Sequence, residues 1–560
     1  MTDLNKKYRY NLKHWLTYII GFAAILLIFV VGAFYMAKPY LDDFVKRELT
    51  RRAIIAETSK VSIMGKVNLT HVTLPVPAGT SLKIGAISAR PPIYFIPGTF
   101  TLYNVDLKHN NIHVQIPKIS LKSVSLKEKD TAITPHLLQL IMRIKLASIF
   151  APDISLSIEN KSTQKIKVKN FQLSNLKNGY IRSVSIKNMN FTTAVENGNK
   201  QMYLVTKSDA IKAQNIDINY AYSIFCKENN SFDQGKTVTG PVSLNNVMVD
   251  IFKETEKSAS FSLGQFKTSG LQMKPFKQSP KKLIKAYLNA RNTNNQIAKK
   301  TAQNDILLNT FLATTSVDAK VDNVTVDIPQ LKATLESLQF KPSMWKQPIP
   351  KKILLSLDNL SISPNKIKEK SLNPLKKMNF ESLDISGNLD ISYDEKERTL
   401  FLNTISLNVK DVGSGEISAK ITDVGEKLFT GQKDIMIAAS QDIGINEINI
   451  HYMLAAGFID KIFSFLTENL NDEKYDLKKE LYDVFYLVTT QILTVVLKSP
   501  DKAKNIVEAI SNLSKNPQTF TVKIKAKNNK SLKIADLKSL KQKDLSTVLS
   551  KIHLTIDHEK

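Results

Sequence analysis

The chain has 560 residues, with 78 Lys and Arg against 51 Asp and Glu, and a formal net charge of +27. Hydrophobic residues make up 42% of the chain and charged residues 23%, so it can bury a core and wholesale disorder is excluded. Gly is scarce, at 19 residues, which argues against a protein built on Gly-rich phosphate loops. The single Cys, Cys226, excludes an intramolecular disulfide framework and a Cys-based structural zinc site.

The first predicted element is a transmembrane helix at residues 15–37, a stretch without a charged side chain. As a helix it would span about 34 Å, enough to cross a hydrocarbon layer about 30 Å thick. A cleaved signal peptide is the alternative, but its apolar region is usually about 7–15 residues, and residues 34–37 form a poor cleavage site. We therefore expect an uncleaved membrane anchor, with these apolar and interfacial side chains: Trp15, Tyr18, Leu26, Leu27, Phe29 and Tyr35.

Basic residues lie on both sides of this anchor, so the Lys and Arg count does not decide its orientation. Long domains translocate largely regardless of charge, so we expect residues 1–14 to be a cytoplasmic stub and the rest to be exported. Lys greatly outnumbers Arg, and Asn and Ile are abundant, which is typical of an AT-rich bacterial genome. The predicted location is the bacterial inner membrane, with a single span and a periplasmic body.

After the anchor, residues 38–60 are predicted to form a helical stalk, because Leu41, Phe44, Val45 and Leu49 recur on one helical face. From residue 61 to 444 the apolar period changes to two, which predicts a β-rich domain of half-buried antiparallel strands. After a series of short strands up to residue 126, the predicted strands are 154–158, 166–173, 181–191, 216–218, 242–251, 261–273, 317–328, 331–340, 353–362, 383–393, 399–409 and 416–424.

Two helical inserts are expected within the β-rich domain. Residues 136–150 follow a Pro and have the apolar spacing of a short amphipathic helix. Residues 281–312 are rich in Lys, Asn, Gln and Ala, which predicts a helix plus a mobile loop. The mainly β fold is thus a long antiparallel sheet, curved into a groove or closed as a sandwich, with helical interruptions.

Residues 445–560 are predicted to form an α+β C-terminal region with mostly three helices. Apolar side chains share one helical face over residues 455–470 and again over 477–495. Ser499, Pro500 and Asp501 form a helix start, with a cap, a Pro at the first helical position and an acid at the positive end of the helix dipole. Residues 519–525 and 553–556 are predicted strands.

A short pattern recurs along the β-rich domain. Asn or Asp precedes an alternating apolar run in segments that begin at Asn104, Asn245, Asp322 and Asp358. The spacing of these segments is irregular, so a strict solenoid is not indicated. The pattern suggests that one strand unit is reused along one long sheet.

The sequence offers little chemistry. His109 and His113 would lie about 13 Å apart on one strand, too far for a single metal ion, unless a turn at residues 110–111 brings them together. We interpret them as exposed polar positions of a hairpin. The acidic pairs Asp472/Glu473 and Glu395/Glu397 are interpreted as solvated, and Cys226 as a half-buried inert thiol. We therefore predict no enzymatic activity and no catalytic, cofactor-binding or metal-binding residues.

The Lys excess alternates with apolar residues along strands, as at Lys165, Lys167 and Lys169, which places it on the solvent face. Such Lys residues keep exposed strands soluble and discourage edge pairing. The alternative function is long-range attraction to anionic phospholipid or lipopolysaccharide headgroups. Nucleic-acid binding is not expected, because the Lys residues are not clustered or interleaved with aromatic residues.

The layout of an anchor at residues 15–37 followed by recurring NVDL, NVMVDI, NVTVDI and NLSIS strands resembles the AsmA-like, repeating-β-groove envelope proteins. The tail is similar to the ends of single-anchor alphaproteobacterial envelope proteins and of YdgA-like chains. The resemblance implies a protein that binds lipid and supports lipid transport and envelope homeostasis, although this chain is short for bridging two membranes. A structural or interaction scaffold with a filled β core is the alternative.

Overall fold

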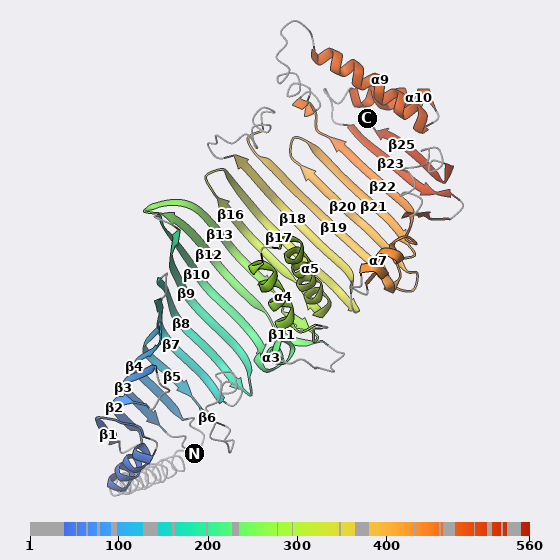
Figure 1. The fold of residues 1–560 in the computed structure, drawn as a ribbon. Coiled ribbons are helices and arrows are strands. Elements are labelled where there is room, and N and C mark those ends of the chain that lie inside the picture. Colours follow the sequence, from blue (N-terminus) through green and yellow to red (C-terminus); the bar gives the residue numbers. More distant parts are fainter. Residues whose placement is uncertain are drawn as a thin grey trace, which may run out of the picture. The chain divides into compact units, whose positions relative to one another are not determined.

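The computed structural model describes residues 38–559 apart from several internal segments. The segments not described are 52, 63–64, 75–78, 91–97, 127–143, 160–162, 198–199, 227–234, 277, 294, 347–348, 365–379, 430–432, 459–460, 463–476, 498, 512–517, 528–529 and 535–549. The chain divides into two compact units, unit 1 at residues 1–201 and unit 2 at residues 202–560. The structure is mainly β, as the sequence predicts, and the sheets are antiparallel (Figure 1).

Unit 1 is a meander in which nearly every strand pairs with the next one along the chain. The exception is the short β6, which pairs with the start of β7 while β5 pairs with β7 directly. A helix at residues 38–51 precedes the sheet and forms most of the predicted stalk. The strands are β1 (Thr58–Val61), β2 (Val67–Thr73), β3 (Thr80–Arg90), β4 (Thr99–His109), β5 (Ile112–Lys122), β6 (Ser125–Leu126), β7 (Ile144–Glu159), β8 (Thr163–Lys177) and β9 (Tyr180–Asn197).

Unit 2 repeats this arrangement with a longer series of strands, and each strand of the series pairs with the one that follows it. In order they are β10 (Lys200–Asp217), which begins at the boundary, β12 (Val242–Lys253), β13 (Glu256–Thr268), β16 (Ala319–Asp327), β17 (Leu331–Lys346), β18 (Ile349–Pro364), β19 (Leu383–Asp394), β20 (Thr399–Val409), β21 (Gly413–Thr422), β22 (Gly444–Leu454), β23 (Gln518–Ala526) and β25 (Ile552–Glu559). β24 (Leu532–Lys533) pairs with the start of β22.

A small α/β insert is formed by the connections from β10 to β12 and from β13 to β16 in unit 2. It contains the three-stranded sheet β11 (Lys236–Thr239), β14 (Leu271–Met273) and β15 (Thr314–Val317), with helices α3 (Ile218–Cys226), α4 (Pro280–Asn292) and α5 (Gln296–Ala313). Its core is formed by Tyr220, Ile224, Val238, Met273 and Ala313, and the Tyr220 hydroxyl donates a 2.7 Å hydrogen bond to the Met273 carbonyl. The predicted insert at 281–312 is therefore confirmed as helical, but it is a pair of helices.

The remaining helices lie toward the C-terminus. They are the 3₁₀ helix η2 (Glu426–Phe429), α7 (Lys433–Ser440), α9 (Leu477–Leu497) and α10 (Pro500–Ser511). The start of α10 at Pro500 agrees with the capping pattern in the sequence. Because β22, β23 and β25 continue the pairing from β21, the predicted C-terminal region is built onto the same sheet of unit 2 and contributes three of its strands.

Within the strands the side chains do not alternate strictly. In β8 the partly or fully buried apolar residues are Ile166, Val168, Phe171, Leu173 and Leu176, so two of the intervals are three residues instead of two. Each three-residue interval contains an Asn with a positive φ, namely Asn170 (51°) and Asn175 (49°). A left-handed residue inserts one extra position into the pleat, so the apolar side chains on both sides of it face the same way.

Such breaks in alternation line up across neighbouring strands, and a left-handed Asn stands at the break in three of them. In unit 2 we call the following line the seam: Asn246, Gly264, Asn323, Glu336 and Asn359, from β12, β13, β16, β17 and β18. All three of its Asn residues have positive φ, between 48° and 54°. Asn tolerates this backbone region several-fold better than most residues, and β-branched residues do so poorly. The seam therefore allows each strand to shift its alternation at the same level, which preserves cross-strand pairing and a common apolar face.

The glycine of the seam is required by close approach of its neighbour. A Cβ atom on Gly264 would lie 2.9 Å from the Cβ of Asn323 and 3.2 Å from the Asp322 carbonyl oxygen. At the end of the seam the backbone N–H of Asn359 donates a 3.0 Å hydrogen bond to the Ser386 hydroxyl. β19 has no extra residue at this level. The step from Leu357 to Leu360 in β18 covers three residues, and the facing step in β19 covers two.

Two sequence predictions change in light of the fold. The helix predicted at residues 136–150 is wrong in its described part, because residues 144–150 begin strand β7. The strand predicted at 216–218 is the end of β10, and Ile218 already begins α3. The predicted membrane span at 15–37 lies outside the described residues. Among the helices that are described, none has both the length and the apolar character needed to cross a bilayer.

The seam makes a specific prediction for Asn323. We expect Asn323→Val to lower the free energy of unfolding by about 1–3 kcal/mol, because a β-branched residue is forced into the left-handed region. Asn323→Gly should cost less than about 1 kcal/mol, since Gly adopts this conformation without strain. Urea unfolding measures both changes. Thr325→Val, on the same strand, is the control and should be nearly neutral; equal losses for the two Val variants would contradict the role of the seam.

Asp318 joins the insert to the sheet, and its protonation should loosen that junction. Its Oδ1 accepts hydrogen bonds from the Thr268 hydroxyl (3.1 Å) and from the Ser269 hydroxyl (2.8 Å) and backbone N–H. Burial alone would raise the pKa of the Asp318 carboxyl, but these hydrogen bonds together lower it below its usual value. The stabilisation is thus present above the unfolded-state pKa of about 3.9 and is lost as the pH falls through the lower folded-state pKa.

Asp318→Asn is therefore expected to melt at a lower temperature than the wild type at pH 7, because the amide is a weaker acceptor than the carboxylate. The difference in melting temperature should shrink as the pH is lowered below about 4, because the Asp318 carboxyl of the unfolded wild-type chain gains its proton there before that of the folded protein does. Thermal unfolding of both proteins at pH 7 and pH 3 measures this difference. A difference that stays constant over that range would show that the carboxylate form contributes nothing.

Candidate functional site

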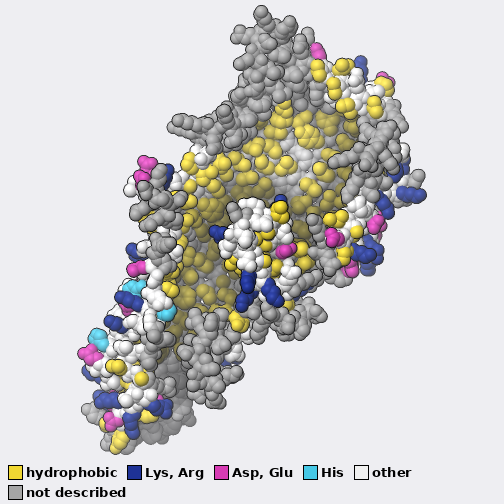
Figure 2. All heavy atoms as spheres, viewed as in Figure 1, with side chains coloured by type: hydrophobic (Ala, Val, Ile, Leu, Met, Phe, Trp, Pro, Cys, Tyr) yellow, Lys and Arg dark blue, Asp and Glu magenta, His cyan; other side chains and the backbone are white. Residues whose placement is uncertain are grey.

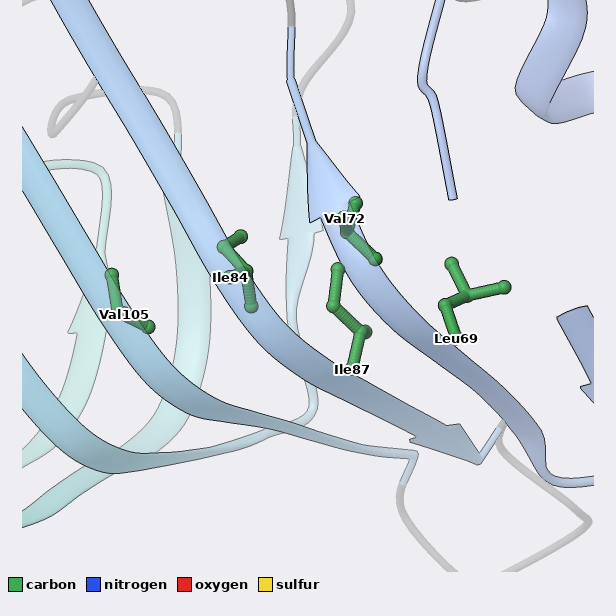
Figure 3. Close-up of a cluster of buried hydrophobic side chains, with 5 residues drawn as sticks. All are labelled: Leu69, Val72, Ile84, Ile87 and Val105. Carbon is green, nitrogen blue, oxygen red and sulfur yellow. The ribbon is translucent and has the colours of Figure 1, made fainter. Parts of the chain in front are cut away.

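The candidate site is the apolar face of each sheet, which we call the inner face. In unit 1 it carries a buried cluster of Leu69, Val72, Ile84, Ile87 and Val105, whose side chains lie on one side of β2, β3 and β4 (Figure 3). Leu69 and Val72 lie on either side of His71, which has a φ of 46°. Ile84 and Ile87 are likewise three residues apart, so the inner face of unit 1 also depends on a break in alternation.

The helix at residues 38–51 covers this part of the inner face. Val45 and Leu49 pack against the buried cluster, as their predicted helical face requires. The Asp42 carboxylate accepts a 2.9 Å hydrogen bond from the Val61 backbone N–H, which fixes the helix to β1. Phe44 belongs to the same predicted face but is 57% exposed. The inner face of unit 1 is therefore closed at its first strands.

Beside this closed part is a cavity of about 690 Å³. Its lining is mostly apolar, with Val67, Phe100 and Leu121 from the inner face and Arg90 at the end of β3. This volume is in the range of small-molecule pockets, which are commonly about 300–1,000 Å³. The lining offers no pair of groups suited to acid–base or nucleophilic chemistry, so the cavity favours binding of an apolar group.

The inner face of unit 2 is apolar and only partly covered. None of the apolar residues of β12, β13, β16, β19, β20 and β21, all fully described strands, is fully buried, and most are half-buried. Leu407 is 52% exposed, Ile417 38% and Phe261 36%. Figure 2 shows apolar side chains gathered on a hollowed face of the molecule. A filled sandwich would bury such residues against a second layer, and no second layer is present among the described residues.

The inner face of unit 2 is closed at its last strands. Leu454 of β22 and Phe520 of β23 are buried together with Ile506 of α10, and Leu493 of α9 packs on this cluster. The helix pair α9–α10 thus covers the end of the face. On β22, two residues before Leu454, Tyr452 is 38% exposed. Its ring packs beside Gly415 of β21, and a Cβ atom on Gly415 would lie 3.4 Å from the ring. Burial raises the pKa of the Tyr452 hydroxyl.

The opposite, outer face of each sheet is polar. In unit 1 Lys165, Lys167 and Lys169 are exposed on β8, as predicted. In unit 2 the outer face carries cross-strand ion pairs, with Lys352 Nζ 3.3 Å from Asp390 and Lys257 Nζ 2.7 Å from Asp250. The contrast between a charged outer face and an apolar inner face is the main chemical feature of the molecule.

The structure separates the predicted His pair into two different polar contacts. His109 and His113 lie on the two strands of the β4–β5 hairpin, as predicted. His109 Nδ1 is 2.7 Å from the Thr80 hydroxyl, and His113 Nε2 is 3.1 Å from the Asp106 carboxylate. Burial tends to raise the pKa of Asp106, but hydrogen bonds from His113 and Gln115 lower it overall. No group of His, Cys, Asp or Glu suited to a metal ion occurs among the described residues.

The other singled-out residues do not assemble into a site. Glu395 lies 3.5 Å from Lys351 Nζ in an ion pair, and the Glu397 backbone N–H donates to Asp394. Cys226 is the last residue of α3, and its side chain is outside the described set. Asp472, Glu473 and the six predicted anchor residues, Trp15, Tyr18, Leu26, Leu27, Phe29 and Tyr35, also lie outside the described residues.

Sequence reasoning identified the apolar strands but missed the left-handed residues that align them. The signal was present in the recurring segments, because Asn104, Asn246, Asn323 and Asn359 all fall in that pattern and all have positive φ. A second cavity of about 470 Å³ over β19–β23 was also not predicted. Its lining is mixed and includes Asn388, Glu416, His451 and Tyr452.

Similarity to known proteins is found in the C-terminal part of unit 2. A family model described as "Uncharacterized protein" matches residues 406–559, from within β20 to β25. None of the curated proteins gives a significant match to the chain. The family match spans well under half of the 560 residues, so the C-terminal part of unit 2 is similar to that family and the chain as a whole is not assigned to one.

Proposed function

We propose that this protein is a non-enzymatic, AsmA-like protein of the bacterial cell envelope that binds acyl lipids on its inner face. In this proposal residues 15–37 hold it in the inner membrane and the described body lies in the periplasm. It supports lipid transport and envelope homeostasis. The observation that carries the proposal is the open apolar face of unit 2, in which no apolar residue of β12, β13, β16, β19, β20 and β21 is fully buried and Leu407 is 52% exposed.

Exposed apolar area of this kind is costly in water, and large contiguous patches usually mark binding sites. The face is lined by many Val, Ile and Leu side chains, with few polar groups that would fix the orientation of a compact ligand. Acyl chains suit such a surface because they need apolar contact over a length and no specific hydrogen bonds. The hollowed form in Figure 2 favours a linear, flexible ligand over a flat one.

A scaffold function is the second candidate, and α9 is the feature that favours it. Val484 (59% exposed), Leu487 (59%), Ile492 (58%) and Val495 (67%) form an apolar stripe on this helix. Such a stripe is typical of a helix that docks on a partner. The two candidate functions differ in what they require of the inner face. Lipid binding requires this face to be open, and a scaffold does not.

Lipid binding predicts that the full chain, purified without added lipid, carries acyl lipid detectable by mass spectrometry. Leu407→Asp combined with Ile417→Asp should reduce the bound lipid by about tenfold, because each carboxylate faces acyl chains without a partner. The control is Asn408→Asp combined with Ser418→Asp, which places the same charges on the outer face of the same strands and should leave the bound lipid unchanged. Absence of acyl lipid from the wild type would favour the scaffold.

The proposed location makes a separate prediction. A reporter enzyme that is active only in the periplasm, fused after Lys560, should be active in cells that make the full chain. The same fusion to a chain lacking residues 1–37 should lose this activity, because export depends on the predicted anchor. Activity of a cytoplasm-specific reporter at the same site, with no periplasmic activity, would overturn the orientation.

A further inference from the structure

In the view of Figures 1 and 2 the helix pair α4–α5 lies in front of the inner face of unit 2. Buried residues Leu283 and Ala290 of α4 and Ala302 and Leu312 of α5 hold the pair together and to the insert. At its base the Lys274 N–H donates a 2.7 Å hydrogen bond to the Ala313 carbonyl.

Both helices expose large apolar side chains in addition to those they bury. Ile284 and Leu288, one turn apart on α4, are 52% and 45% exposed. Leu307 and Phe311, one turn apart on α5, are 68% and 46% exposed. Residues four apart lie on one side of a helix, so each helix has an apolar stripe that is about half exposed. A half-exposed stripe in front of a partly covered apolar sheet suggests that both contact the same apolar ligand.

The same helices are strongly basic. Asp305 is the only acidic residue from Pro280 to Ala313. The basic residues in this range are Lys281, Lys282, Lys285, Arg291, Lys299 and Lys300. All of them are exposed except Lys299, which is half-buried. A cationic surface with apolar stripes complements a ligand that has an anionic head and apolar chains.

We infer that the α4–α5 pair is a selectivity element that holds the anionic phosphate headgroup of a phospholipid whose acyl chains lie on the inner face of unit 2. This inference rests on the proposed function and adds the class of lipid to it. Lys and Arg on the pair attract the phosphate, while Ile284, Leu288, Leu307 and Phe311 contact the upper part of the chains. The sheet alone offers only apolar contact, which does not distinguish one headgroup from another.

The test compares the full chain with a variant that removes four cations from the pair: Lys281→Gln, Lys285→Gln, Lys299→Gln and Lys300→Gln. The probes are vesicles of phosphatidylcholine alone and vesicles with added phosphatidylglycerol, and the readout is the lipid of each kind bound per protein. The wild type should prefer phosphatidylglycerol by at least about tenfold at low salt. This preference should weaken as salt is raised.

The four-Gln variant should lose the preference and still bind phosphatidylcholine as the wild type does. The matched control replaces four exposed outer-face cations of unit 1, Lys165, Lys167, Lys169 and Lys187, with Gln, which changes the net charge equally. This control should keep the preference. Circular dichroism and the melting temperature establish that both variants fold as the wild type does.

The results distinguish failure of this inference from failure of the proposed function. A preference retained by the four-Gln variant, or lost equally in the outer-face control, would overturn the role of the α4–α5 pair. Equal binding of both lipids by the wild type would overturn the inference and leave acyl binding intact. Failure of the wild type to bind either lipid would instead remove the proposed function on which the inference rests.

Discussion

The fold depends on a backbone constraint: a few residues inside the strands adopt the left-handed conformation. A long strand alternates its side chains between two faces, so any slip in the apolar pattern would send half of the strand's apolar residues to the wrong side. At Asn323 the positive φ of 54° absorbs one residue, so Val321 and Val324 both remain on the inner face. Because the neighbouring strands make the same shift at the same level, the sheet keeps its pairing and its apolar side.

This constraint explains both the regularity and the openness of the sheet in unit 2. A local break in the pleat bends a strand and increases its twist, and a line of such breaks bends the sheet along that line. A bent sheet has a hollowed side, and in this protein that side is the apolar one. The described helices cover this side only in part: α9 and α10 close its last strands around Leu454 and Phe520, and α4 and α5 stand before it.

Much of the strand content could be predicted from the sequence, because alternation of apolar and polar residues is a local property. The meander at β19–β21 and the capped start of α10 at Pro500 agree with their patterns. The error at residues 144–150 has the same cause as the seam. In β7 the inner-face residues Leu146, Ile149 and Ala151 are three and two positions apart, and this mixed spacing resembles the period of a helix.

The candidate site was harder to predict, because it depends on what the sheet leaves uncovered. Periodicity identifies an apolar face but does not distinguish a sandwich from a trough, since both have the same alternation. The distinction requires the exposure of residues such as Leu407 and Ile417 in the folded chain. Likewise, the basic character of residues 281–312 was visible in the sequence, but its position before the apolar face was not.

A protein that keeps an apolar face open in water needs a partner for that face, and the charge distribution indicates which kind. In unit 2 the outer face places Lys beside Asp, as at Lys352 and Asp390, so part of its charge is balanced locally. The α4–α5 pair has almost no acids, so its positive charge is not balanced within its own helices. Interspersed charges of both signs avoid a large field of one sign, whereas unbalanced positive charge next to apolar surface favours an amphipathic anion. The apolar sheet therefore accounts for the affinity for acyl chains, and the basic helices account for the choice among headgroups.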